Sequence, residues 1–283
     1  MTPQRSDKSA HRNPSATNWH YRCVSLHVHR YGPPGPVRLL AIHGLTGHGQ
    51  RWRSLAAGHL PDISVAAPDL LGHGRSSWAA PWTIDANVTA LAGLLDDLAD
   101  APVVVVGHSF GGAVALHLAN AHPDRVSALV LLDPAIGLDG EWMRKIADAM
   151  LASPDYPDAA QARAEKSAGS WVDVEPALLD AELEAHLVEL PNGRYGWRVS
   201  LPAMMSYWSE LARAIVLPPQ GIRTTVVRAA WTVPPYVGDE LIAGLRGRLG
   251  SDFELVDLDC EHMVAQAKPA EVAALIRNDL AHR

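Results

Sequence analysis

Residues 103–113 read VVVVGHSFGGA, and this stretch decides the fold. Its four consecutive valines form an uninterrupted apolar run, which is typical of a strand that a parallel sheet buries on both faces. Small and apolar residues follow the glycines, so the pattern predicts a strand, a sharp turn at Ser109 and then a helix. A serine at such a turn must adopt a strained backbone, which is sterically allowed only because Gly107 and Gly111 have no side chains.

The predicted turn presents the hydroxyl of Ser109 beyond the end of the sheet. The helix that begins after it directs unpaired N–H groups and the positive end of its dipole towards negative charge on a bound molecule. A GxSxG spacing between a strand and a helix is the arrangement of a nucleophile elbow. A glycine-rich phosphate loop is the alternative, but the stretch has neither the lysine of a Walker motif nor the GxGxxG spacing.

Length and composition predict one large globular domain, or one domain that carries an insertion. The chain has 283 residues, of which 48% are hydrophobic and 19% are charged. Its formal net charge of −7 makes nucleic acid and anionic membrane surfaces poor partners. Acidic and basic residues are scattered along the chain, and we therefore expect them on a solvated surface.

The amino-terminal segment and the cysteines indicate a cytoplasmic protein. Residues 1–18 are polar and lack the apolar block of a signal peptide, so we expect a disordered leader. Cys23 and Cys260 are too few for a disulfide framework and are expected to be free thiols. The longest uncharged run, residues 101–123, contains glycines and histidines, so no integral membrane association is expected.

Buried strands alternate with helices along most of the chain, which predicts a parallel sheet covered on both faces. Besides the strand of residues 103–106, buried strands are expected at 37–42, 63–67, 126–132, 224–229 and 253–258, and half-exposed edge strands within 19–29. Helices are expected at 52–58, 84–98, 239–249 and 269–280. No buried strand is evident from 138 to 216, where helical patterns cover 142–151, 159–167, 176–190 and 200–215. The predicted organisation is a leader at 1–18, a core at 19–136 and 218–283, and a helical insertion at 137–217.

Four motifs together resemble those of the α/β-hydrolase family over nearly the whole chain. They are His43-Gly44 after a strand, PDLLGHGRS at 68–76, GHSFGG at 107–112, and His262 before a final helix that Pro269 opens. The resemblance implies a mostly parallel, doubly wound sheet with a helical cap inserted after the sixth strand. Within the family the chain is most similar to the mycobacterial-type esterases and lipases, through residues 66–82 and 190–198.

The resemblance also implies the roles of a set of site residues. Ser109 needs a general base, and His262 follows the last strand in the family's order of serine, acid and histidine. The backbone N–H groups of Leu45 and Phe110 are expected to form an oxyanion hole. Glu261 stands where the family commonly has a glycine, which could add a carboxylate near the imidazole.

The acid that orients His262 has three candidates. The loop at 229–238, where the family usually places it, contains no carboxylate. Asp133 ends a predicted strand at the edge where some relatives place the acid, and we predict that it holds the imidazole. Asp239, a candidate helix cap, and Glu261 are the alternatives.

Several other side chains are expected to have structural roles. His108 is predicted to pack, because a strand–turn–helix geometry directs it away from Ser109. Asp69, His73 and Arg75 are expected to stabilise a loop rather than bind a metal. Some of the cap's large rings should pack, and others, with Met204 and Met205, should line an apolar pocket. These rings are Trp142, Tyr156, Trp171, Tyr195, Trp197, Tyr207 and Trp208.

These observations predict a serine hydrolase that cleaves carboxylic esters of short or medium acyl chains through an acyl-enzyme. The expected partner is a small ester with an apolar acyl part; no cofactor, metal or nucleic acid is expected, and a homodimer is left open. The same residues would also serve a carbon–carbon bond hydrolase, a lactonase or a thioesterase, because a fold does not determine a function. A non-catalytic small-molecule receptor is the remaining alternative.

Overall fold

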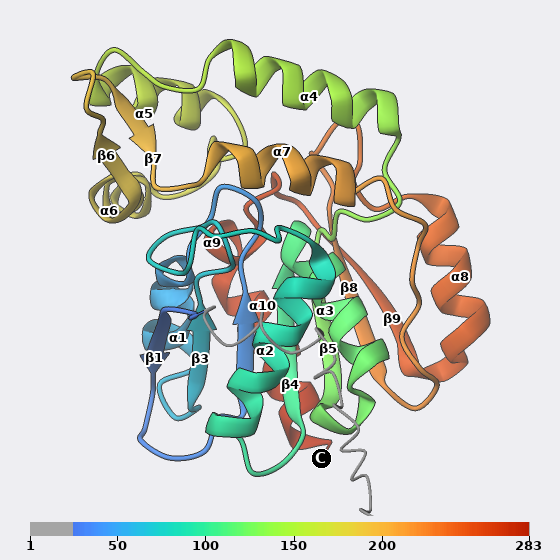
Figure 1. The fold of residues 1–283 in the computed structure, drawn as a ribbon. Coiled ribbons are helices and arrows are strands. Elements are labelled where there is room, and N and C mark those ends of the chain that lie inside the picture. The colour runs from blue at the N-terminus through green and yellow to red at the C-terminus, as the bar shows by residue number, and fades with distance from the viewer. Residues whose placement is uncertain (1–24, 283) are drawn as a thin grey trace, which may run out of the picture.

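The structure is a computed structural model that describes residues 25–282. Within them a seven-stranded sheet forms the centre of the molecule (Figure 1), in the order β1-β3-β2-β4-β5-β8-β9. The strands are β1 Val28–Tyr31, β2 Leu39–Ile42, β3 Val65–Pro68, β4 Val103–His108, β5 Val126–Leu132, β8 Arg223–Ala229 and β9 Phe253–Leu258. Only β1 pairs with its neighbour antiparallel, and the other pairs are parallel. The predicted fold class is confirmed.

Helices cover both faces of this sheet because successive side chains of each strand point to opposite faces. Val103 and Val105 of β4 belong to one apolar core, whereas Val104 and Val106 belong to the other. The first core includes residues of α2 Ile84–Leu98, α3 Phe110–Ala121 and α8 Asp239–Leu249. The second includes residues of α1 Arg53–His59, α9 Val264–Ala267 and α10 Pro269–Ala281. The continuous apolar run of β4 is therefore buried on both sides, as predicted.

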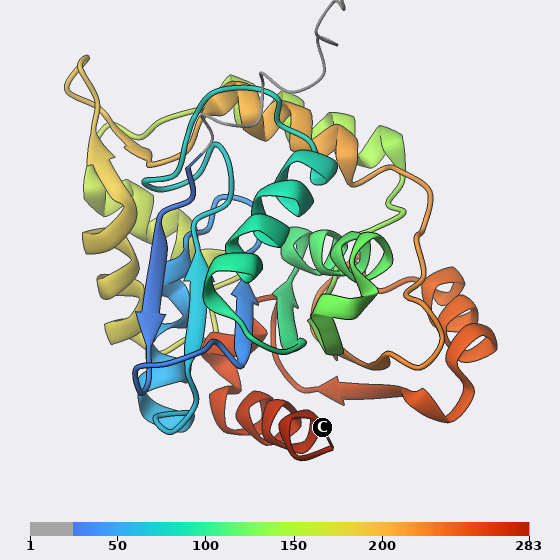
Figure 2. The same ribbon diagram turned by 60° about the horizontal axis from the view of Figure 1, so that its bottom comes forward.

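The chain from β5 to β8 leaves the sheet and lies over the carboxyl ends of its strands (Figure 1). This segment, which we call the insertion, contains α4 Gly140–Ala152, α5 Ala159–Ala168, α6 Pro176–His186 and α7 Leu201–Glu210. It also contains a two-stranded hairpin of β6 Leu187–Glu189 and β7 Tyr195–Trp197. The hairpin lies at the margin of the molecule, where its tip projects (Figure 2).

A helix was predicted over residues 176–190, and the predicted position of its carboxyl end was wrong. Helix α6 ends at His186, and the next residues pair as β6 with β7. The turn between the two strands contains Asn192 and Gly193, and Gly193 has a φ of 75°, a conformation that glycine adopts without strain. The helix predicted over 200–215 likewise ends early, at Glu210.

Three predictions concern residues that the structure does not describe. The leader at 1–18, Cys23 and part of the edge-strand region at 19–29 lie outside the described residues. In the described part of that region, β1 forms a half-buried edge strand. The insertion follows β5, which is the fifth strand counted from residue 25. Within residues 25–282, no helix combines the length and the apolar character needed to cross a membrane.

Candidate active site

Ser109 lies at the turn between β4 and α3 with a φ of 53° and a ψ of −120°. Backbone hydrogen bonds hold it in this uncommon conformation. Its N–H donates to the carbonyl of Leu132 at 3.0 Å, and its own carbonyl accepts from the N–H groups of Gly112 at 2.8 Å and Ala135 at 3.1 Å. The turn is therefore fixed by β5 and the residues after it, and the predicted sharp turn is present.

The two glycines beside Ser109 are required by close backbone contacts. A Cβ at Gly107 would lie 2.4 Å from the carbonyl oxygen of Gly111. A Cβ at Gly111 would lie 2.4 Å from the carbonyl oxygen of Ile42. Gly44 is also close to the turn, because a Cβ there would lie 2.9 Å from the Cβ of Ser109. The loop after β2 thus lies directly against Ser109, and its next residue, Leu45, lines the same cavity as Ser109.

The structure brings His262 and Asp133 together. Asp133 follows β5, is completely buried, and lies with its Oδ2 at 2.5 Å from Nδ1 of His262. Its Oδ1 accepts the backbone N–H of Ala229 at 3.3 Å. Because an ionised carboxylate only accepts hydrogen bonds, Nδ1 carries the imidazole proton and Nε2 is left as an acceptor.

The alternative acids have other surroundings. Asp239 is exposed in the first turn of α8, and the residue that caps this helix is Gly238 rather than Asp239. Glu261 is half-buried, and its Oε2 lies 3.5 Å from Oγ1 of Thr232. In the part of the chain that the structure describes, Asp133 is the one of the three whose carboxylate contacts the His262 ring.

His108 was predicted only to pack, but its side chain also makes a hydrogen bond to the loop that carries His262. Its Nε2–H donates to the backbone carbonyl of His262 at 2.7 Å, and the two rings lie 4.6 Å apart. Burial, reinforced by the neighbouring imidazole, lowers the pKa of His108 well below its usual value. A neutral His108 therefore holds the loop that carries His262.

A cavity of about 500 Å³ contains Ser109 and His262 in its lining, beneath the insertion. Tyr236, which the sequence analysis did not single out, also lines it, with its ring 4.4 Å from that of His262. The ring of Trp142 also stacks on Tyr236, with the two ring centres 5.3 Å apart. The remaining large apolar lining comes from Leu45, Ile146, Met150, Tyr156, Trp171, Trp197, Trp208, Leu211 and Met263.

The prediction that Met204 and Met205 line the pocket was wrong. Met204 is completely buried in the core on the α3 side of the sheet, and Met205 packs against the same core. Tyr207 is also buried there, with its ring 4.6 Å from Phe110 and its hydroxyl donating to the carbonyl of Leu71 at 2.9 Å. Helical spacing indicated that one face of α7 was apolar, but it could not show that this face turns towards the sheet.

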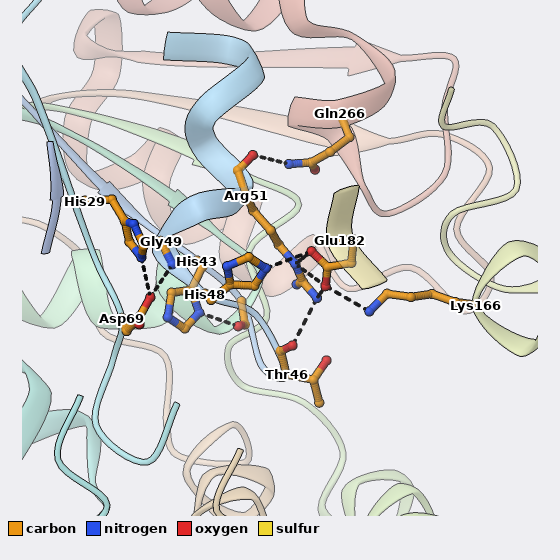
Figure 3. Close-up of polar contacts among 11 residues, drawn as sticks. His29, His43, Thr46, His48, Gly49, Arg51, Asp69, Lys166, Glu182 and Gln266 are labelled. Atoms are coloured by element: carbon orange, nitrogen blue, oxygen red, sulfur yellow. Dashed lines mark hydrogen bonds and ion pairs between the residues drawn. The ribbon is translucent and has the colours of Figure 1, made fainter. Parts of the chain in front are cut away.

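A group of charged side chains is buried around Glu182 (Figure 3), and two of its members line the cavity. Glu182 of α6 accepts from Arg51 at 2.5 Å, from Lys166 of α5 at 3.0 Å and from Nε2 of His48 at 2.9 Å. Arg51 also donates to the carbonyl of Thr46 at 3.0 Å. The side chains of Arg51 and Lys166 are only 6% and 11% exposed, and both line the cavity. The expectation that charges would lie on a solvated surface was wrong for these residues.

The ionisation of this group follows from its burial. Burial opposes ionisation of Glu182, but Arg51 and Lys166 outweigh it and hold the pKa of that carboxyl well below its usual range. Burial lowers the pKa of Lys166 to about 8, against the attraction of Glu182. Burial also lowers the pKa values of His48 and His186, so both rings are neutral near pH 7.

One further cluster has the residue types of a metal site. The side chains of His27, His29 and Asp69 each offer a ligand atom, and these atoms all lie within 4.8 Å of one another. The Asp69 carboxylate already accepts the backbone N–H groups of Gly49 at 2.7 Å and Arg75 at 2.8 Å. These bonds support the predicted loop-stabilising role of Asp69.

With this geometry established, comparison with known proteins identifies the family. Residues 39–275 match the model of the alpha/beta hydrolase family, and the chain belongs to that family. It is 69% identical over 260 residues to the protein named Lipase LipV of Mycobacterium tuberculosis, a match that covers 92% of this chain and 99% of that one. The predicted resemblance to mycobacterial-type esterases and lipases is thereby confirmed.

Two solved structures share the fold at low sequence identity. The first, E-2-(acetamidomethylene)succinate hydrolase, is 21% identical, has a TM-score of 0.77, and matches 92% of this chain and 97% of its own. The second, the Mycobacterium tuberculosis esterase Rv0045c, is 22% identical, has a TM-score of 0.67, and matches 90% of this chain and 92% of its own. At such identities the likeness establishes the fold alone.

Proposed function

We propose that this protein is a serine hydrolase that cleaves small carboxylic esters through an acyl-enzyme. The observation that carries the proposal is the hydrogen bond of 2.5 Å between Asp133 and Nδ1 of His262, in a cavity that Ser109 also lines. This contact fixes the tautomer whose free Nε2 can accept a proton from a hydroxyl. The name of the relative that is 69% identical, Lipase LipV, supports ester hydrolysis as the reaction.

In the proposed reaction, Oγ of Ser109 attacks the ester carbonyl while its proton passes to Nε2 of His262. The tetrahedral intermediate collapses, the bond to the alcohol oxygen breaks, and the imidazolium returns the proton to that oxygen. Water then attacks the acyl carbonyl while one of its protons passes to Nε2, the bond between the acyl carbon and Oγ breaks to release the acid, and the imidazolium returns the proton to Oγ of Ser109. Asp133 stabilises the imidazolium in both halves of the reaction.

The backbone N–H groups of Phe110 and Leu45 are the proposed donors to the oxyanion. Phe110 is the first residue of α3, where helix geometry leaves the N–H without an intrahelical partner. Leu45 follows Gly44, which lies against the Ser109 turn, and it lines the cavity. Each such donor contributes about 3 kcal/mol to stabilisation of the transition state.

Residues 137–217, which form most of the insertion, are proposed to act as a cap that limits the size of the substrate. Helices α4, α5 and α7 contribute to the lining of the cavity. A volume of about 500 Å³ is in the range of small-molecule sites. Short or medium acyl chains therefore fit the site better than long triglycerides.

Hydrolysis of a panel of compounds tests this proposal. We expect turnover of 4-nitrophenyl esters with acyl chains of about two to eight carbons, and much slower turnover of a diketone, a lactone and a thioester. Ser109→Ala should reduce kcat by about 10⁵- to 10⁶-fold. Ser127→Ala, in β5 and not part of the cavity lining, is the matched control and should retain the wild-type rate. Preferred turnover of the diketone, lactone or thioester would replace the proposed reaction with one of those alternatives.

A further inference from the structure

We propose that Lys166 and Arg51 form a subsite for an anionic group, a carboxylate or a phosphate, carried by the substrate. The inference rests on the proposed ester hydrolysis and refines its substrate class. The preferred ester would then have an apolar stem and a negatively charged end, rather than the wholly apolar acyl part that the sequence suggested.

The position of the two cations is the first argument. Arg51 lies in a short 3₁₀ helix at Gly49–Trp52, Lys166 lies in α5, and they reach Glu182 from different elements (Figure 3). Both side chains line the cavity that also contains Ser109 and His262. A substrate held for attack by Ser109 therefore shares one cavity with two cationic groups.

The balance of charge is the second argument. Arg51 and Lys166 share a single buried carboxylate, that of Glu182, and the neighbouring imidazole of His48 is neutral. The group therefore has an excess of positive charge. Glu165 also lines the cavity, but it is exposed, and its Oε1 accepts from the hydroxyl of Tyr156 at 2.9 Å. An anionic substrate would supply a second buried counter-charge to Arg51 and Lys166.

Unused hydrogen-bond donors are the third argument. Arg51 donates through Nε and Nη2, and within residues 25–282 no acceptor is hydrogen-bonded to its Nη1. Nζ of Lys166 has three N–H groups, of which one is used by Glu182. Lys166 also lies 3.6 Å from the ring centre of Trp197 and 5.2 Å from that of Trp171. The Lys166 side chain is only 11% exposed, so a charge-assisted hydrogen bond from its ammonium to an anion would be stronger there than on the surface.

The same contacts also join the insertion to the core, because Glu182 belongs to α6 and Arg51 to the loop region after β2. A purely structural clamp predicts that loss of a cation lowers stability and slows all substrates in the same proportion. A subsite predicts a change in the ratio between charged and uncharged substrates. The two roles can therefore be separated by substrates that differ only in charge.

Three 4-methylumbelliferyl esters provide that comparison: the hexanoate, the monoester of adipic acid and the 5-phosphonopentanoate. We expect the wild-type protein to have a kcat/KM at least about tenfold higher for one or both anionic esters than for the hexanoate, since a charge-assisted hydrogen bond contributes that much. Lys166→Met should abolish this preference, and Lys166→Arg should retain it. Lys145→Met, which removes an exposed lysine of α4, is the matched control and should leave all three rates unchanged.

The outcomes distinguish this inference from the proposed function. Preference for the carboxylate or for the phosphonate ester identifies the anion. Hydrolysis of the hexanoate without any preference for an anionic ester would overturn the subsite and leave ester hydrolysis intact. A preference that survives in Lys166→Met, while the thermal midpoint falls, would assign the group to a structural clamp. Failure of the wild-type protein to hydrolyse any of the three would overturn both proposals.

Discussion

Replacement of Asp133 by asparagine tests the proposed role of the acid without a change in side-chain volume. Asp133 accepts two donors, Nδ1–H of His262 at 2.5 Å and the N–H of Ala229 at 3.3 Å. An asparagine has one oxygen and one NH₂ group, so when its oxygen pairs with Ala229 its NH₂ faces Nδ1. The imidazole proton must then move to Nε2, where it prevents acceptance of the proton of Ser109. We expect kcat to fall by about 10⁴-fold, equivalent to about 5.5 kcal/mol.

The assay is steady-state hydrolysis of a 4-nitrophenyl ester, together with the thermal midpoint of each variant. The midpoint of Asp133→Asn should change little, because the amide can satisfy both neighbours in the buried site. Asp239→Asn and Glu261→Gln are matched controls, since these carboxylates have other surroundings, and both should retain the wild-type kcat. A near-normal kcat in Asp133→Asn, with a large loss in either control, would refute the assignment of the acid.

Three further predictions concern other parts of the structure. His108→Phe removes the donor to the carbonyl of His262. The variant should lose about 1–3 kcal/mol in the free energy of unfolding and have a lower kcat with little change in KM. An unchanged kcat would exclude a positioning role for His108. Gly107→Ala should prevent accumulation of folded protein, because its Cβ would lie 2.4 Å from a backbone oxygen. Gly93→Ala in α2 is the control and should be tolerated, because a Cβ there meets nothing within 4 Å. Equal expression of the two alanine variants would contradict the close contact. Burial raises the pKa of Asp279 from 3.8 to about 6, so ionisation of this group costs stability as the pH rises from about 4 to 6. Asp279→Asn should therefore lose that part of the pH dependence in urea titrations; a variant that still loses stability to the same extent between about pH 4 and 6 would contradict this.

The elements around Ser109 could be predicted from the sequence because local sterics determine them. Four valines specify a strand buried on both faces, and the absence of a Cβ at Gly107 and Gly111 permits the turn. The contact between Asp133 and His262 could also be anticipated, because parallel strands present their carboxyl ends at the same edge of the sheet. In each case the sequence pattern and the structure are related by a short-range or topological rule.

The parts that could not be predicted depend on long-range packing. Arg51 and Glu182 are 131 positions apart, and no local pattern marks either charge as buried. Tyr236 comes from a loop with no regular periodicity, so nothing in its neighbourhood indicated that its ring would face His262. The β6–β7 hairpin is different, because the Asn-Gly pair at 192–193 is a recognised turn signal and could have predicted it.

The most direct test of the central claim is identification of the residue that an active-site-directed fluorophosphonate modifies. After reaction, peptide mass spectrometry of the wild-type protein should locate one adduct, on Ser109, and its formation should parallel the loss of esterase activity. Ser109→Ala should remain unmodified. An adduct on any other side chain, or complete loss of activity without modification of Ser109, would contradict the account.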